Sequence, residues 1–283
     1  MSSPPEAERK RRLLYGRRKG PRLSAHQERL LETLLPQLRL KLELGADPLS
    51  YFSPPPCGEV ETREAFRVGE LSTPRPPPGS PRTKTLGSST SPQGGGEEHD
   101  KVINQVWLEV GFGAGEHLLW QAQHHPDVGL IGAEPYISGI AKLLSKIDSL
   151  TPHAAREHVS NIRIHDGDAR DIVDALPDAS LDRVFILFPD PWPKARHRKR
   201  RFVQTGMLDG LARVLKRHAE LRFASDDADY AAWTLEHFLA HPAFEWTALR
   251  AEDWKERPED WPQTRYEEKA LHGAPVFFRF RRK

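Results

Sequence analysis

The segment 105–115, QVWLEVGFGAG, places three glycines at alternate positions directly after an apolar run. Gly111, Gly113 and Gly115 can adopt positive φ and carry no Cβ, so the backbone of such a turn can approach a ligand closely. The free N–H groups of a helix that starts near residue 116 would point at the same place. The pattern predicts a ligand site built from backbone at a strand-to-helix turn, with a purely structural turn as the alternative.

Glu109 indicates which kind of ligand this turn accepts. A dinucleotide-binding turn reads G-x-G-x-x-G and faces a pyrophosphate. Here the pattern is E-x-G-x-G-x-G, with the acid inside the end of the strand. A carboxylate repels a pyrophosphate and attracts a cation, and S-adenosylmethionine carries both an ammonium and a sulfonium group. The sequence therefore favours S-adenosylmethionine as the cofactor, bound by Glu109 and the three glycines.

Acidic residues also follow the other expected strands. Glu134 lies 23 residues after Gly111, close to the ~20-residue offset at which an acid binds ribose hydroxyls. Asp168 has two interpretations, a hydrogen bond to the adenine amino group or the N-cap of the following helix. Asp190 and Asp226 end the next two strands. An exposed loop acid is the alternative at Glu134, but five acids at equivalent positions indicate a site.

The elements that position these acids alternate regularly along the chain. We expect strands at 106–110, 128–133, 162–165, 183–187, 221–224 and 276–280, and helices at 116–124, 137–150, around 172 and at 202–215. This alternation predicts an α/β fold with a Rossmann-like, doubly wound, mostly parallel sheet. Ligands of such sheets bind beyond the carboxyl ends of the strands, where the acids are expected.

The stretch 188–201, FPDPWPKARHRKRR, combines a stiff turn with a dense run of cations. Three prolines restrict the backbone around Asp190 and Trp192. Six Lys or Arg residues follow between 194 and 201, among them Lys194, Arg198 and Arg200. A nucleic acid would fit this stretch, with its phosphates on the basic run and a base near the carboxylate and the indole ring. A solvated charge run is the alternative, although it leaves the position at the expected site unexplained.

The N-terminal part divides into a basic arm and a low-complexity segment. Eight Lys or Arg residues lie within 9–22, which suits either a phosphate backbone or a solvated tail. Ser24 and Gln27 form a capping box for a short helix that should end near Pro36. Residues 47–100 hold ten Pro, seven Gly and seven Ser, and we expect a disordered insertion. The predicted organisation is a basic arm with a short helix at 1–46, the insertion at 47–103 and a domain that binds S-adenosylmethionine at 104–283.

The composition argues against disulfide-bonded, metal-binding and membrane proteins. The chain has 283 residues and a net charge of +2, and Cys57 is its one cysteine, so neither an internal disulfide nor a Cys-rich metal site is expected. The histidines show no H-E-x-x-H or Cys/His ligand spacing, so no metal is expected. No apolar run approaches the ~20 residues that span a bilayer, and no signal-peptide core is visible. We expect a cytoplasmic protein that does not contact a membrane, with a monomer favoured.

Several motifs together resemble the bacterial tRNA (guanine-N7-)-methyltransferases. They are GFGAG after LEV, the acid in GAEP, the string at 188–201, ASD at 224–226 and TRYE at 264–267. The resemblance implies a class I methyltransferase fold, S-adenosylmethionine as cofactor, tRNA as partner and methylation of the guanine at position 46 in the variable loop. It also implies that Glu109, Glu134 and Asp168 contact the cofactor and that Asp190 is the catalytic acid. The residues that it implies to contact the substrate are Lys194, Asp226, Thr264, Arg265, Tyr266 and Glu267.

Two other interpretations stay open. One is a methyltransferase of the same fold that acts on another RNA base, a protein or a small molecule. The other is a non-catalytic RNA-binding protein, which predicts damage to the cofactor-site acids, and none is visible. Guanine N7 carries an in-plane lone pair and no proton at neutral pH, so its methylation needs no general base. We therefore expect Asp190 to orient the guanine or to stabilise the charge that arrives on its ring.

Overall fold

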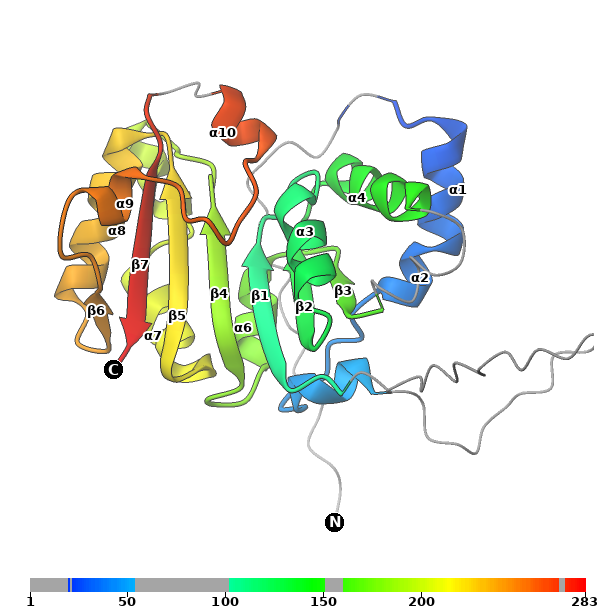
Figure 1. Cartoon of the computed structure of the whole chain (residues 1–283), viewed down its shortest axis with the longest axis horizontal. Coiled ribbons are helices and arrows are strands. Elements are labelled where there is room, and N and C mark those ends of the chain that lie inside the picture. Colours follow the sequence, from blue (N-terminus) through cyan, green and yellow to red (C-terminus); the bar gives the residue numbers. More distant parts are fainter. Residues whose placement is uncertain (1–19, 21, 54–101, 151–159, 270–272) are drawn as a thin grey trace, which may run out of the picture. The chain divides into compact units, whose positions relative to one another are not determined.

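Seven strands form one sheet in the part of the chain that the computed structural model describes, which is residues 20, 22–53, 102–150, 160–269 and 273–283. The strand order is β3-β2-β1-β4-β5-β7-β6 (Figure 1). The bounds are β1 (Gln105–Val110), β2 (Val128–Ala133), β3 (Ile162–His165), β4 (Leu181–Leu187), β5 (Leu215–Ser225), β6 (Phe244–Trp246) and β7 (Val276–Arg282). Strands β1 to β5 pair in parallel, and β7 runs antiparallel to β5 and β6. The expected doubly wound, mostly parallel sheet is confirmed.

Helices cover both faces of this sheet. One core packs α1 (Ala25–Thr33), α3 (Glu116–His124) and α4 (Ile137–Ser149) on the sheet. The other core packs α6 (Ala169–Ala175), α7 (Thr205–Val214) and α8 (Ala228–Ala240). The remaining helices are α2 (Leu35–Leu38), η1 (Pro48–Phe52), η2 (Ala195–Arg200), α9 (Glu252–Lys255) and α10 (Arg265–Lys269). Helix α8 and strand β6 were not expected from the sequence, and β5 begins six residues before the strand expected at 221–224.

Strand β1 shows how the sequence specifies a two-faced sheet. Val106, Leu108 and Val110 face the core under α6, α7 and α8, whereas Trp107 faces the core under α3 and α4. Side chains alternate in this way along any strand, so a strand covered on both faces needs apolar residues at nearly every position. Glu109 shares the face of Trp107, which directs its carboxylate toward α3.

The first helix begins as the capping box predicts. The Ser24 hydroxyl accepts a hydrogen bond from Gln27 N, and the Gln27 side chain accepts one from Ser24 N. Helix α1 ends at Thr33, three residues before Pro36, and Pro36 lies in the first turn of a separate short helix, α2, that continues to Leu38. Proline lacks the N–H that a first turn leaves unused, so it is tolerated there. Helix α1 then packs against α4.

The segment 47–53 is ordered against the sheet, unlike the disorder expected from residue 47 onward. In η1, the Phe52 ring lies so close to Gly129 on β2 that a Cβ there would come within 2.4 Å of it. Arg163 stacks on Phe52 at 5.0 Å and donates a hydrogen bond from Nε to the Tyr51 carbonyl at 2.7 Å. The rest of the expected insertion, 54–101, and the basic arm up to residue 19 lie outside the described residues.

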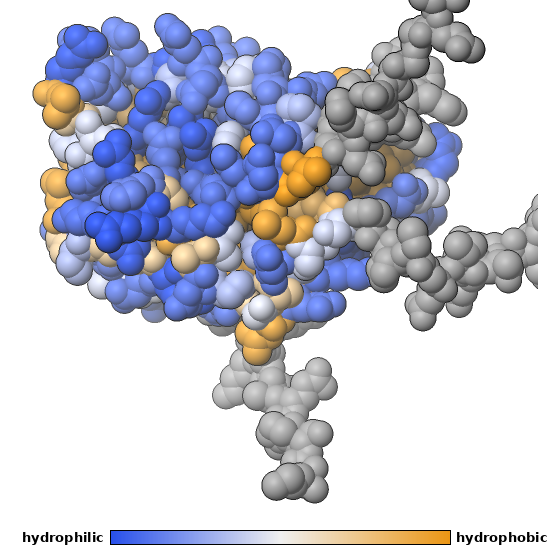
Figure 2. Space-filling model, turned by 60° about the horizontal axis from the view of Figure 1, so that its bottom comes forward, coloured by the Kyte–Doolittle hydropathy of each residue, from blue (hydrophilic) through white to orange (hydrophobic). Residues whose placement is uncertain are grey.

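The surface is mainly hydrophilic on the face that Figure 2 shows, which brings the amino ends of the parallel strands forward. Exposed large apolar side chains in the described part are Leu44, Val102, Ile137, Leu239 and Leu249. Among the described helices, none is long and apolar enough to cross a membrane.

Candidate functional site

The strand order reverses between β1 and β4, which are parallel neighbours in the middle of the sheet. From β1 the chain continues to β2 and β3 on one side, and from β4 to β5 on the other. Open sheets of this kind bind ligands in the crevice beyond the carboxyl ends of the strands at such a reversal. We call the carboxyl ends of β1 to β5, with the turns that follow them, the rim. It is the upper edge of the sheet in Figure 1.

The turn after β1 is the glycine turn that the sequence predicts. Gly111, Gly113 and Gly115 have φ values of 69°, 57° and 73°, a region that other residues rarely adopt. A Cβ at Gly111 would meet nothing within 4 Å, so open space lies beside this backbone. Helix α3 starts directly afterwards at Glu116. The turn after β1 therefore combines accessible backbone with open space that suits a ligand.

Glu134 directly follows β2 and accepts a hydrogen bond from the glycine turn. Its carboxylate accepts hydrogen bonds from Gly113 N and Tyr136 N, both at 2.8 Å, and the residue is 7% exposed. Burial raises the pKa of this carboxyl to about 7, against the lowering effect of the two backbone donors; the nearby charges of Asp190 and Glu109 raise it further. Each carboxylate oxygen has a second lone pair, so Glu134 can still accept ligand hydroxyls.

Glu109 lies beneath the glycine turn and is buried. Its Oε2 is 2.8 Å from Nδ1 of His117 on α3, and both side chains are less than 5% exposed. Gln121 Nε2 lies 3.1 Å from His117 Nε2 and donates to the Asp260 carbonyl at 3.0 Å. Because that amide nitrogen is a donor, Nε2 of His117 is the acceptor, and the ring donates from Nδ1 to Glu109.

The hydrogen bonds among Glu109, His117 and Gln121 extend to Asp260 and so join the carboxyl-terminal segment to the core. Arg222 on β5 forms two hydrogen bonds with the Asp260 carboxylate, at 2.8 and 2.7 Å. The Trp261 ring stands edge-on to His117 at 5.7 Å and is 2% exposed. No local sequence signal marks His117 or Gln121, because they contact Glu109 and Asp260 only after α3 packs on the sheet.

Asp168 takes the N-cap position of α6. Its carboxylate accepts hydrogen bonds from Arg170 N at 3.0 Å and from the Arg170 guanidinium. The capping alternative is therefore confirmed. The contact with adenine stays a prediction, and it would require the Arg170 side chain to give up part of this ion pair.

The turn after β4 holds Asp190 in a strained backbone. Phe188 and Trp192 have φ values of 49° and 46°, in the left-handed region that disfavours residues with a Cβ. Phe188 N donates to the Ala224 carbonyl at 2.8 Å, which ties the turn to β5. Asp190 is exposed, and its negative charge is one of the smaller causes that raise the pKa of Glu134.

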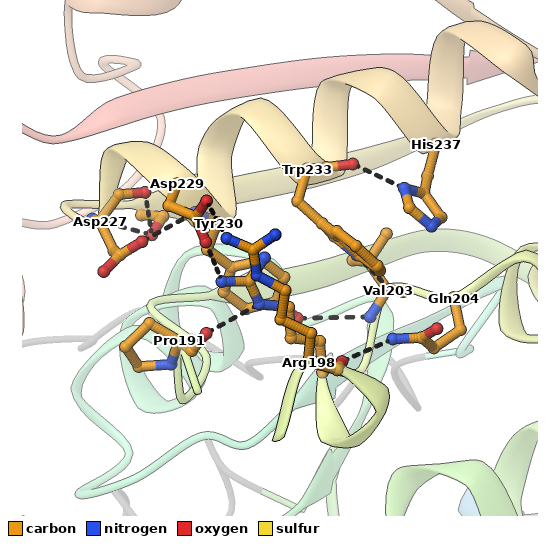
Figure 3. Close-up of polar contacts among 11 residues, drawn as sticks. Pro191, Arg198, Val203, Gln204, Asp227, Asp229, Tyr230, Trp233 and His237 are labelled. Carbon is orange, nitrogen blue, oxygen red and sulfur yellow. Dashed lines mark hydrogen bonds and ion pairs between the residues drawn. The ribbon is translucent and has the colours of Figure 1, made fainter. Parts of the chain in front are cut away.

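The basic run after this turn does not present all its cations to solvent. Arg201 is 2% exposed, and both it and Arg198 form ion pairs with Asp229 on α8. Figure 3 shows Arg198 and Pro191 beneath α8, from which Asp229 and Tyr230 project. The expectation that the whole run binds phosphates is wrong for Arg201. Lys194, together with Arg196 and Lys199, is exposed, and Arg200 stacks on Trp192 at 5.1 Å.

The remaining expected contacts come from β5 and α10. Asp226 directly follows β5, and Gly273 lies near its backbone, since a Cβ there would be 3.5 Å from the Asp226 carbonyl. Figure 1 shows α10 at the same end of the sheet as the rim. The fold therefore brings α10 to the end of the sheet where the rim lies, which spacing in the sequence could not indicate.

The side chains around α10 differ in accessibility. Thr264 is 7% exposed and its hydroxyl accepts a hydrogen bond from Glu267 N at 3.3 Å. Glu267 pairs with Arg257 at 2.9 Å; burial raises the pKa of its carboxyl, and Arg257 opposes that rise. Arg265 is exposed, and the Tyr266 side chain lies outside the described residues. Within the described ranges, no group of three or more His, Cys, Asp or Glu could hold a metal ion.

Comparisons with known proteins match nearly the whole chain. Residues 103–279 match a family model described as "Putative methyltransferase". The tRNA (guanine-N(7)-)-methyltransferase of Rhodospirillum rubrum is 45% identical over 273 residues, which cover 95% of this chain and 87% of the relative. That of Chelativorans sp. (strain BNC1) is 38% identical, with 96% of each chain covered. The solved structure of 16S rRNA methyltransferase KamB is 16% identical with a TM-score of 0.46, over 64% of this chain and 89% of that chain, a likeness too weak to bear on mechanism.

Proposed function

The chain belongs to the tRNA (guanine-N(7)-)-methyltransferase family, and from this premise we propose that it methylates N7 of a guanine in tRNA with S-adenosylmethionine as the methyl donor. The guanine is that at position 46 of the variable loop, as the motifs at 188–201 and 264–267 imply. The observation that carries the proposal is the adjacency of β1 and β4 at the reversal of strand order. It puts the glycine turn and Asp190 side by side, so donor and acceptor can meet.

The residues of the rim fit S-adenosylmethionine. The glycine turn offers backbone next to open space, and Glu134 offers lone pairs for the ribose hydroxyls. We assign Glu109 to the cofactor through its negative charge beneath the turn, and Asp168 to the adenine amino group. When bound there, S-adenosylmethionine supplies a methyl group on a positively charged sulfur.

Asp190 acts on the acceptor base by position and charge. The N7 lone pair of guanine forms the new bond without losing a proton, so no residue has to serve as a base. Positive charge reaches the purine ring during this step, and a carboxylate held rigidly beside the ring stabilises it. The strained turn and its tie to β5 supply that rigidity.

Cations and α10 bind the tRNA. Lys194 and Arg200 contact phosphates, and Asp226 with the 264–267 segment contacts the guanine and its neighbours. Arg198 contributes less than these two, because Asp229 already holds its guanidinium at 2.7 Å.

The reaction is tested by methyl transfer from labelled S-adenosylmethionine to unmodified tRNA, followed by nucleoside analysis for 7-methylguanosine. Asp190→Asn should lower kcat at saturating tRNA by about 10-fold or more, the scale of losing one electrostatic contact to a transition state. Asp178→Asn is the matched control, since this exposed acid pairs with Arg213, outside the rim. A methylated product other than 7-methylguanosine would contradict the proposed substrate, and full kcat in Asp190→Asn would contradict the role of Asp190.

The phosphate contacts are tested by the salt dependence of tRNA binding. Lys194→Ala and Arg200→Ala should each reduce the slope of log K against log salt by about 1 while S-adenosylmethionine affinity stays unchanged. Arg281→Ala, which removes an exposed cation paired with Glu245 on β6, should leave the slope unchanged. An equal loss of cofactor affinity in the first two variants would refute the assignment.

A further inference from the structure

The backbone on either side of Asp190 needs something to hold it. The left-handed region is disfavoured for residues that carry a Cβ, and both Phe188 and Trp192 occupy that region. Such conformations persist only where the surroundings over-determine them. The hydrogen bond from Phe188 N to Ala224 fixes the side of the turn next to β4. A different contact has to fix the side that leads to Trp192.

Arg201 provides this contact from within the basic run. Its Nε donates a hydrogen bond of 2.8 Å to the carbonyl of Pro191, the residue directly after Asp190. Its Nη2 forms an ion pair with Asp229, and hydrogen bonding by Arg201 holds the pKa of the Asp229 carboxyl below its ordinary value. One planar guanidinium thus joins the turn to α8.

Aromatic rings complete the binding site of this guanidinium. Its central carbon lies 4.8 Å from the ring centre of Tyr230 and 5.2 Å from that of Trp233, both on α8. Trp233 Nε1 in turn donates to the Val203 carbonyl at 2.8 Å, and Figure 3 shows Trp233, Tyr230 and Asp229 on one side of α8 above Pro191. Stacking and hydrogen bonds hold Arg201 in one orientation.

A buried ion pair is weak evidence for a contribution to stability. The desolvation of a buried guanidinium offsets much of its attraction to a carboxylate, and apolar replacements of such pairs are often neutral. The location of Arg201 is more informative than its charge, because it is the buried cation that contacts the residue next to Asp190. Its neighbours Lys199 and Arg200 are more exposed.

We propose that Arg201 is a positioning residue for methyl transfer: through Pro191 and Asp229 it holds Asp190 at the rim in the conformation that meets the acceptor guanine. The inference rests on the proposed function of Asp190. It divides the basic run by role, with outward cations that bind RNA and an inward arginine that shapes the turn.

The test replaces Arg201 by lysine, which keeps the charge but cannot bond Pro191 and Asp229 through one rigid plane. Arg201→Lys should lower kcat for methylation of tRNA by about 10-fold or more, with KM for tRNA and its salt dependence within about twofold of wild type. Asp229→Asn changes a half-exposed position on α8 and should lower kcat by a similar factor. It keeps the test decisive if Arg201→Lys fails to fold. Unchanged kcat in both variants would overturn the proposal, as would a raised KM with a smaller salt slope.

Arg213→Lys is the matched control. The Arg213 guanidinium also binds backbone carbonyls, those of Leu176 at 2.7 Å and Val173 at 2.6 Å, but on α6 and its C-terminus. This variant should keep full kcat. Amide hydrogen exchange of Phe188, whose N–H donates to the Ala224 carbonyl in the same turn, separates the inference from the proposed function, since it needs no substrate. Arg201→Lys should speed this exchange about 10-fold or more and leave the glycine turn unchanged; unchanged exchange at Phe188 would refute the positioning role.

Discussion

Glu134 should make the stability of the protein fall as pH rises toward neutrality. Burial raises the pKa of its carboxyl from 4.5 to about 7. At about 1.4 kcal/mol per pKa unit, this difference favours the protonated form in the folded state by about 3 kcal/mol. Below pH 4.5 the carboxyl is protonated in both states and this stabilisation is fully present. As pH rises through 7, the unfolded state has already lost the proton and the folded state has to ionise a buried group, so the stabilisation is lost.

The variant Glu134→Gln removes this dependence. It also loses a backbone hydrogen bond, because one amide nitrogen replaces an acceptor oxygen at Gly113 or Tyr136, but that effect is the same at every pH. The measurement is the free energy of unfolding from urea titrations between pH 4.5 and pH 8. The difference between variant and wild type should move by about 3 kcal/mol in favour of the variant across this range.

The control is Glu245→Gln at the exposed position of β6, which removes the same charge, so its stability should depend on pH as that of wild type does. A change below about 0.5 kcal/mol for Glu134→Gln across the range would refute the reasoning, because the carboxylate would then be as well solvated as in the unfolded chain. A second assay follows from the proposed ribose contact. The ionised carboxylate is the stronger acceptor, so the Kd of S-adenosylmethionine should be about 10-fold higher at pH 6 than at pH 8.

Four further perturbations test other parts of the structure. Gly139→Ala places a Cβ within 2.4 Å of the Gly113 carbonyl oxygen, so calorimetry should show S-adenosylmethionine binding weakened by about 10-fold or more; wild-type affinity would show that the turn yields. Gln121→Leu removes the amide that joins α3 to the carboxyl-terminal segment. The KM for tRNA should therefore rise several-fold while cofactor affinity stays unchanged. A loss of cofactor affinity with an unchanged KM for tRNA would contradict the described network. Replacing 54–100 by a short Gly-Ser linker should leave Tm within a few degrees of wild type. Phe52→Ala should lower stability by about 2 kcal/mol, because its ring packs on Gly129. A larger loss of Tm for the linker variant than for Phe52→Ala would refute the placement of η1.

The sequence by itself determined the order of the elements and the position of the site along the chain. Strands 128–133 and 162–165 and helix 116–124 have the bounds expected from their patterns. The glycine turn has the positive φ values that its three glycines predict. These features depend on residues close together in the chain, where dihedral preference and apolar periodicity act directly. Helix α8 was missed although Asp227 caps it, because apolar residues lie around most of its circumference and leave no clear apolar stripe at helical spacing.

Only the tertiary structure decided which partner each charged side chain has. Arg198, Arg200 and Arg201 look alike in the sequence, yet Arg201 is buried under α8, which begins 27 residues later. The Glu109 carboxylate, near the end of β1, pairs with His117 on α3, a partner that the sequence does not indicate. The backbone conformation of a turn is set within a few residues, whereas the burial and partner of a side chain depend on the element that packs against it, and that element can come from any part of the chain.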